Sequence, residues 1–254
     1  MEAVCTRRIH TMPRTRAAVR KRRNRKFLAK CFVWVLMLGA AALSLRIASG
    51  WDDTFLTGLP VEPVLQKPEL PNGCEAASLT QVLNYLGFPA DKMEIAYDYI
   101  PRVDFTEDGS VRTGPNPESA YPGDPATSRG FYCFAGPVCE GANAYLEVQG
   151  SALRAHDVTG VTEEGLREYL NQGIPVIVWV TLDFSAPYKG DFVWTDTATG
   201  EVIEPYMNLH CIVLTGMGED LCVVADPLRG TRHVDKTDFL RSFAEVGSRA
   251  VVID

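Results

Sequence analysis

The chain has 254 residues, of which 46% are hydrophobic and 22% charged, and its net charge is −7 at neutral pH. This is the composition of an ordinary globular protein with one medium-sized domain and short appendages. No internal repeat and no low-complexity segment is present, which excludes a repeat array or a low-complexity chain.

The first 30 residues form a basic arm with eleven Lys or Arg residues and one acidic residue, and the rest has 14 basic and 31 acidic residues. An uncharged apolar run, "CFVWVLMLGAAALSL" (31–45), follows this arm. Its length lies between the core of a signal peptide, about 7–15 residues, and a membrane span, about 17–25 residues. The positive charges flank only its N-terminal side, so we expect the arm in the cytoplasm and the chain after Ile47 outside.

This pattern divides the chain into four expected segments. Residues 1–30 are a basic cytoplasmic arm, 31–47 an uncleaved signal anchor or the apolar part of a signal peptide, 48–61 a stalk, and 62–254 a folded domain. The protein is then a single-pass protein of the cytoplasmic membrane with its C-terminal domain outside, or it is secreted after cleavage at residues 48–50. A buried core helix would not explain the flanking charges, and we expect no nucleic-acid binding.

Five cysteines lie in the part that is expected outside: Cys74, Cys133, Cys139, Cys211 and Cys222. In an oxidising compartment such residues should pair or be functional, and an odd number leaves at least one over. Cys133 and Cys139 close the short loop "CFAGPVC" and are the expected disulfide.

Helical patterns come first in the folded domain, after a stalk that we expect to run into a first strand. An apolar stripe predicts a helix over 74–86, begun by Asn72 or Gly73 and closed by Gly87. Further helices are expected over 137–148 and 163–172, and a long surface loop over the Pro- and Gly-rich segment 101–130.

Strand patterns follow. The β-branched run at 174–182 predicts a central strand covered on both faces. Residues 209–216 and 221–227 predict a hairpin, and 249–253 predicts a last strand, after a helical turn at 238–243. The order predicts an α+β fold, with N-terminal helices segregated from a mostly antiparallel sheet on which they pack.

Cys74 stands at the start of the first expected helix. A helix N-terminus carries about half a positive charge and free N–H groups, which lower the pKa of a thiol. A cysteine taken alone is more often buried or disulfide-bonded. A nucleophile also needs a base and a donor for the developing oxyanion.

His210 is the expected base, because it alone of the four histidines begins an apolar strand. If the hairpin strands pair with residue numbers that sum to 436, His210 lies opposite Asp226, which could hold the imidazole tautomer. A slip of one residue would send the two side chains to opposite faces. The same parity puts Cys211 and Cys222 on opposite faces as packing residues. Taken singly, His210 could be a core histidine and Asp226 a turn residue.

Gln66, eight residues before Cys74, is the expected oxyanion donor. A glutamine amide donates two hydrogens without carrying a charge. Gln66 could instead be a surface residue of the stalk.

Four segments carry a resemblance: "LQKPELPNGCEAASLTQVLNYLG", "GDPATSRGFYCFAGPVCEGANAYL", "LREYLNQGIPVIVWVTL" and "HCIVLTG…VVADPLRG". Over residues 62–253 they resemble bacterial papain-like cysteine peptidases related to the bacteriocin-processing, double-glycine family. The resemblance implies a papain-like fold, with Cys74 as nucleophile, His210 as base, Asp226 as its orienting partner and Gln66 as oxyanion donor. The bacteriocin processors are fused to a transporter that is not recognisable here, so a leader-peptide substrate is not implied.

The sequence therefore predicts a cysteine peptidase that hydrolyses peptide or protein substrates outside the cytoplasmic membrane, which it contacts through residues 31–47. An amidase or transferase acting on cell-wall peptides, or a non-catalytic binding module on the same fold, remains an alternative. We expect no cofactor. A zinc site of His210, Cys211 and Cys222 lacks a supporting CxxC pair, and the loop at 104–109 lacks calcium-loop spacing.

Overall fold

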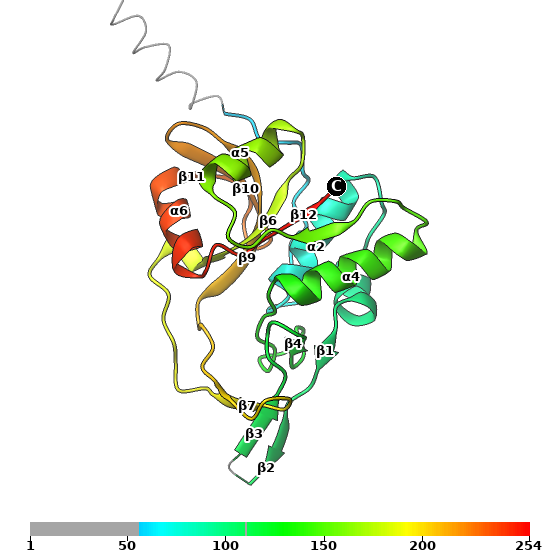
Figure 1. The fold of residues 1–254 in the computed structure, drawn as a ribbon, viewed down its shortest axis with the longest axis vertical. Coiled ribbons are helices and arrows are strands. Elements are labelled where there is room, and N and C mark those ends of the chain that lie inside the picture. The colour runs from blue at the N-terminus through cyan, green and yellow to red at the C-terminus, as the bar shows by residue number, and fades with distance from the viewer. Residues whose placement is uncertain (1–55, 110) are drawn as a thin grey trace, which may run out of the picture. The chain divides into compact units, whose positions relative to one another are not determined.

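The computed structural model describes residues 56–109 and 111–254 (Figure 1). The predictions for the basic arm, for the apolar run at 31–47 and for the beginning of the stalk lie outside the described residues. Within the described part of the chain, no helix is both long and apolar enough to cross a membrane.

The longer helices lie close to where the sequence predicts them. They are α2 (Cys74–Tyr85), α4 (Ala135–Val148), α5 (Glu163–Asn171) and α6 (Lys236–Glu245). The expected turn at 238–243 is a full helix, because Asp235 caps it by accepting the N–H of Asp238 at 2.9 Å. The short elements are α3 (Lys92–Glu94), η2 (Ile95–Tyr99) and η3 (Leu182–Phe184).

A six-stranded sheet with the order β11–β10–β9–β6–β12–β5 forms the centre of the domain, and all its neighbouring strands are antiparallel. The strands are β5 (Ala155–Asp157), β6 (Val176–Thr181), β9 (Leu209–Met217), β10 (Leu221–Asp226), β11 (Gly230–Asp235) and β12 (Ala250–Ile253). All six residues of β6 are buried, which confirms the predicted central strand. β5 and β11 were not predicted, because β5 has only three residues and both strands are largely polar.

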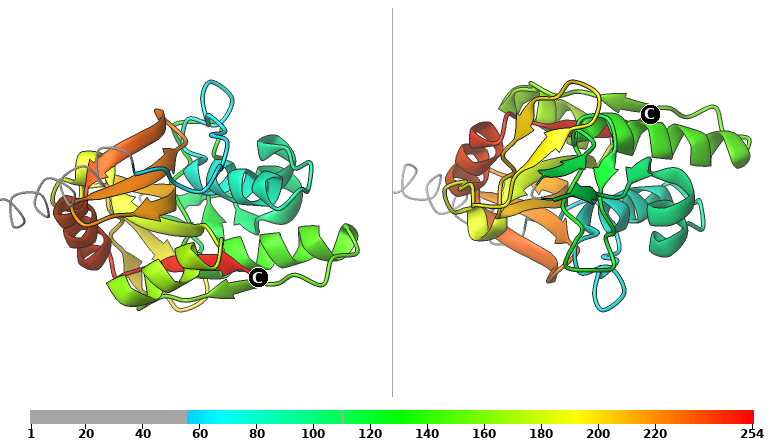
Figure 2. Two further views of the ribbon diagram at one scale, coloured as in Figure 1. Left: turned by 90° about the horizontal axis from the view of Figure 1, so that it is seen from above. Right: turned by 90° about the horizontal axis from the view of Figure 1, so that it is seen from below.

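Helices cover both faces of this sheet (Figure 2). One core cluster joins α2 and α4 to a sheet face that includes Trp179 and Cys211. The other joins α5 and α6 to a face that includes Ile212 and Cys222. The predicted opposite orientation of Cys211 and Cys222 is confirmed. The predicted segregation of helices from the sheet is wrong for α5 and α6, whose apolar residues cover the second face.

The segment 101–130 is not the plain loop that its Pro and Gly content predicts. It contains β1 (Arg102–Val103), β2 (Thr106–Asp108), β3 (Val111–Gly114) and β4 (Tyr121–Pro122). β2 and β3 join β7 (Trp194–Asp196) and β8 (Val202–Ile203) in a second sheet, seen at the lower end of Figure 1. Strands of two to four residues are too short to show a period in the sequence. No strand precedes α2 in the described residues, so the expected first strand is absent there.

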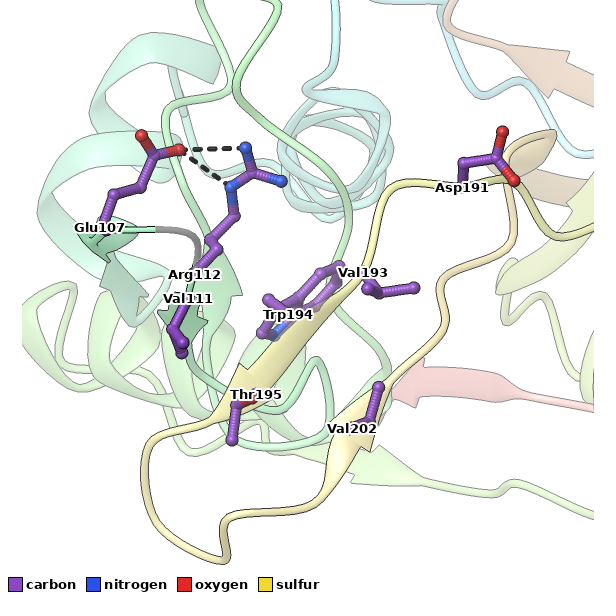
Figure 3. A pocket seen from close by; sticks show the side chains of 9 residues that line it. Glu107, Val111, Arg112, Asp191, Val193, Trp194, Thr195 and Val202 are labelled. Atoms are coloured by element: carbon purple, nitrogen blue, oxygen red, sulfur yellow. Dashed lines mark hydrogen bonds and ion pairs between the residues drawn. The ribbon is translucent and has the colours of Figure 1, made fainter.

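A hollow of about 490 Å³ lies on this second sheet (Figure 3). Arg112, on its wall, pairs with Glu107 at 2.9 Å, and its guanidinium carbon lies 3.9 Å from the ring centre of Phe192. Trp194 and Val193 come from the strand region on the other side. None of the predicted site residues lines this hollow.

Candidate active site

Cys74 is the first residue of α2, and the expected helix start is confirmed. Gly73 is the N-cap residue and offers no side-chain cap. A Cβ atom at position 73 would lie 2.7 Å from the Cβ of Leu70, so a side chain there would force the preceding turn to shift. The glycine lets this turn pass close to the helix start, and it offers no side-chain acceptor to the first N–H groups of α2. The N–H of Glu75 bonds to its own carboxyl group.

The thiol of Cys74 is buried; only 7% of the residue is exposed. Its Sγ lies 3.3 Å from Oε2 of Glu75, and the backbone N–H of Cys211, the residue after His210, faces the sulfur. Burial raises the pKa of the Cys74 thiol well above its ordinary value, and the negative charge of Glu75 raises it further. The expectation that the helix start alone favours the thiolate is wrong in this arrangement, because desolvation outweighs the helix field.

His210 and Asp226 are in direct contact. Nε2 of His210 lies 2.8 Å from Oδ1 of Asp226, and both side chains are buried. The predicted proximity of the two residues is therefore present, and the contact uses Nε2 of the imidazole. Nδ1 is the ring nitrogen left for another partner.

A bulge in β9 makes this contact. Gly216 pairs with Val223 and Leu214 with Val224, so Thr215 is an extra residue in β9. Numbers of paired residues sum to 439 before the bulge and to 438 after it, so the predicted sum of 436 is wrong. With the even sum, His210 lies diagonal to Asp226 on the same face. Without the extra residue the odd sum would continue, and the two side chains would point to opposite faces.

Within the described part of the chain, Asp226 accepts three hydrogen bonds. Besides His210, its donors are the backbone N–H of Leu228 at 2.8 Å and Nη1 of Arg232 at 3.1 Å. Burial alone would raise the pKa of Asp226, but the hydrogen bond and charge of His210, aided by Leu228 and Arg232, bring it to about 2. An aspartate that is ionised at neutral pH keeps a proton on Nε2 of the imidazole and leaves Nδ1 free to accept one.

Gln66 is buried, with 3% exposed, which excludes the surface-residue alternative. Its Nε2 donates to the carbonyls of Leu70 at 3.2 Å and Pro71 at 2.7 Å, and its Oε1 has no partner among the described residues. Both amide hydrogens thus hold the turn that leads into Cys74. The oxyanion-donor role stays a prediction, and it requires the amide to release one of these carbonyls.

The predicted disulfide is absent, because Cys133 and Cys139 are both free thiols. Cys133 lies before α4, where its N–H donates to Oε1 of Glu75 at 3.1 Å and its carbonyl accepts from Nε1 of Trp179 at 2.9 Å. Cys139 lies within α4, where the charge of Asp157 acts on it. The two cysteines have different surroundings, although they are close in sequence.

Glu75 is the site residue that sequence reasoning missed. An acidic residue in the first turn of a helix is ordinarily a surface residue that favours the helix dipole. Glu75 is instead 1% exposed and contacts Cys74. The only signal in the sequence was its position directly after the candidate nucleophile. Among the described residues, no three or more His, Cys, Asp or Glu side chains are arranged to hold a metal ion.

Three similarities to known proteins fit this site. The model of the Peptidase_C39-like family matches residues 59–251. The uncharacterized protein YvpB of Bacillus subtilis (strain 168) is 30% identical over 190 residues, which cover 74% of this chain and 72% of YvpB. A crystal structure of a protein assigned as a C39-like peptidase from Bacillus anthracis superposes with a TM-score of 0.67 at 31% identity, over 78% of this chain and 96% of that one.

A more distant likeness is to a double-glycine motif protease from an AMS/PCAT transporter, solved in complex with its leader peptide. Its TM-score is 0.42 at 19% identity, over 77% of this chain and 91% of that one. The family match spans most of the chain, and the fold is the α+β papain-like fold of this family. The chain belongs to the Peptidase_C39-like family.

Proposed function

We propose that this protein is a cysteine-type peptidase in which Cys74 attacks the peptide bond and His210 moves the protons. The observation that carries the proposal is the contact of His210 with an ionised Asp226, made by the bulge in β9. It commits Nε2 to the carboxylate. The sulfur of Cys74 lies against the backbone N–H of the next residue along that strand. Membership in a peptidase-like family supports the same function.

The reaction would proceed by acyl transfer. Nδ1 of His210 takes the thiol proton, and the Cys74 thiolate forms a bond to the carbonyl carbon of the substrate. The resulting imidazolium gives its proton to the leaving amine as the C–N bond breaks. A water molecule then gives a proton to His210, attacks the thioester and releases the acid, which restores the free thiol.

The oxyanion would be stabilised by the helix start. The backbone N–H of Cys74 belongs to the first turn of α2, where N–H groups have no intrahelical acceptor. Gln66 would add a second donor after its amide turns away from the 70–71 carbonyls. Such a turn exchanges the hydrogen bonds that Nε2 makes to these two carbonyls for one to the oxyanion.

The substrate class follows from the same chemistry: a peptide or protein, or the peptide part of the cell wall if the enzyme is an amidase or transferase. We propose the segment 101–130, whose residues line one side of the hollow in Figure 3, as the region of substrate contact. Action outside the cytoplasmic membrane is proposed from the basic arm and the apolar run alone.

One observation favours the second candidate, a non-catalytic binding module. The thiol is buried, protonated and hydrogen-bonded to a carboxylate rather than poised as a thiolate. In that case the fold would bind a peptide without cleaving it.

An experiment separates these candidates. The full-length chain is incubated under reducing conditions with a defined peptide mixture and, separately, with cell-wall muropeptides, and the products are identified by mass spectrometry. Cleavage of linear peptides that Cys74→Ala abolishes supports the peptidase. Cleavage of muropeptides alone supports the amidase. Binding of peptides with no cleavage of either substrate contradicts the proposed function.

A further inference from the structure

Glu75 is a buried carboxyl group that the proposed reaction does not use. Its side chain lies between the nucleophile and the residues before α4. Oε2 accepts the hydrogen bond of the Cys74 thiol at 3.3 Å, and Oε1 accepts the N–H of Cys133 at 3.1 Å. The indole of Trp179 donates to the carbonyl of Cys133 and also faces the carboxyl group. The position of Glu75 is therefore fixed from two sides.

A thiol has a single proton, which it can donate to only one acceptor at a time. In the structure Oε2 of Glu75 is the carboxyl oxygen within hydrogen-bond distance of the Cys74 sulfur. The proposed reaction requires it to go to Nδ1 of His210, because Nε2 is committed to Asp226. The contact with Glu75 and the first step of catalysis therefore exclude each other for as long as Glu75 is an acceptor.

Among the buried titratable groups at this site, Glu75 is the one whose charge changes near neutral pH. The titratable groups that face it are the thiols of Cys74, Cys133 and Cys211 and the phenols of Tyr121 and Tyr132. Burial raises the pKa of each of them, so all are neutral near pH 7. Burial also raises the pKa of Glu75, to about 7, against the opposing hydrogen bonds from its own backbone, Cys74 and Cys133.

We propose that Glu75 is a positioning residue for the nucleophile: its carboxylate holds the thiol proton of Cys74 at rest, and loss of that charge frees the proton for His210. The inference rests on the proposed function, since it concerns the same thiol. The event requires one proton from solvent, which Glu75 takes up, and no other reagent. A neutral Glu75 can donate its own hydrogen to the sulfur, so the same event that releases the thiol proton also stabilises the thiolate.

The sign of the pH effect follows directly. Below the pKa of Glu75 the carboxyl is neutral and does not repel the thiolate. As the pH rises through about 7, the carboxyl ionises and the thiol becomes harder to deprotonate. The reactivity of Cys74 should therefore rise less steeply with pH than that of a simple thiol.

The test follows alkylation of Cys74 by iodoacetamide against pH, by site-resolved mass spectrometry, on the full-length reduced chain. Glu75→Gln keeps the size of the side chain and an acceptor for Cys133, but carries no charge. Glu75→Asp keeps the charge on a shorter side chain. Glu147→Gln, at an exposed position of α4, is the matched control, and Cys139 is the reference thiol within each sample. Thermal unfolding checks that each variant is folded.

The proposal predicts that Glu75→Gln raises the alkylation rate of Cys74 near pH 8 by about tenfold or more, with a matching downward shift of its titration. Glu75→Asp should not produce this shift, and Cys139 should react equally in all variants. A merely structural role for Glu75 would perturb Gln and Asp variants alike. An unchanged titration in Glu75→Gln overturns the inference. If Glu75→Gln does not fold, the pH dependence of Cys74 alkylation in the parent is the test. Two coupled titration steps support the inference, and a single simple ionisation overturns it.

The result for His210→Ala keeps the two proposals apart. If this substitution suppresses Cys74 reactivity but Glu75→Gln leaves it unchanged, the peptidase mechanism stands and the role of Glu75 falls. If only Glu75→Gln has an effect, Glu75 controls the thiol, but the proposed catalytic pair is contradicted.

Discussion

The helices α2 and α5 begin in opposite ways. α5 begins after Thr162, whose hydroxyl accepts the N–H of Gly165, and its first turn carries two glutamates. α2 begins after Gly73, without any side-chain cap, and its first two residues, Cys74 and Glu75, are buried. A cap contributes about 1 kcal/mol of stability, which α2 forgoes.

This difference separates a helix start that serves stability from one that is available for chemistry. At the start of α5 a threonine side chain accepts a backbone N–H of the first turn, which serves the stability of the helix. The start of α2 receives no cap from the side chain before it, and it places a buried carboxyl next to the sulfur of a cysteine. Residues that break a local rule without local benefit tend to mark functional sites.

The largest expected effect comes from removing the sulfur at the start of α2. Cys74→Ala should lower the rate of peptide hydrolysis by at least about a thousandfold, because no other residue can form the thioester. Its thermal stability should stay close to that of the parent. Cys222→Ala, on the opposite face of the sheet, is the matched control. It should keep full activity and lose about 1 kcal/mol of stability from a small cavity. Residual hydrolysis by Cys74→Ala at the parent rate would refute the nucleophile.

The next effect concerns the partner of the base. Asp226→Asn should reduce kcat/KM by about a hundredfold or more, because an amide can donate to Nε2 and so stabilise the wrong tautomer of His210. The measurement is kcat/KM against pH for both proteins. A variant with parent-like activity over the whole pH range would show that Asp226 does not orient His210.

Asp226 should also make the fold sensitive to acid. Its pKa is about 2 in the folded state, below the ordinary value of about 3.9, so its contribution to stability is present above pH 4 and is lost as the pH falls towards 2. At most about 3 kcal/mol is involved. Urea unfolding of the parent and of Asp226→Asn at several pH values measures this. The stability difference between the two proteins should shrink on acidification, and a constant difference would speak against the assignment.

The smallest effects compare the two helix starts directly. Thr162→Ala should lower the free energy of unfolding by about 1 kcal/mol without changing activity, because only the cap of α5 is lost. Gly73→Ser offers α2 the cap it lacks, yet it should destabilise by about 1–3 kcal/mol, because its Cβ would lie 2.7 Å from that of Leu70. Denaturant unfolding measures both. Stabilisation by Gly73→Ser would show that the uncapped start is not sterically required.

Local signals made much of the fold predictable. α2, α5 and β6 were found because an apolar stripe, a capping threonine and a continuous β-branched run are written in consecutive residues. The short strands β7 and β8 were missed, because β7 pairs with β3, which is distant in the sequence, and β8 pairs only with β7. Contacts made in tertiary structure override weak local preferences.

The site was predictable in part for a similar reason. Cys74 and the partnership of His210 with Asp226 could be reached from helix position and strand parity. The prediction that His210 and Asp226 share a face agrees with the structure, but the pairing register behind it was wrong. The alternation of apolar and polar residues gives no sign of the bulge at Thr215. The burial of Glu75 and the engagement of the Gln66 amide depend on the turn before α2 and on the residues before α4, which no spacing rule describes.

The central claim is that Cys74 and His210 act as a catalytic pair. The most direct measurement is the rate of Cys74 alkylation against pH in the full-length reduced chain, for the parent and for His210→Ala, with Cys139 as the reference thiol. If His210 takes the thiol proton, the variant should react more slowly than the parent or only at higher pH, while Cys139 should react equally in both. A Cys74 that reacts identically in both proteins, or in neither, would contradict the central claim.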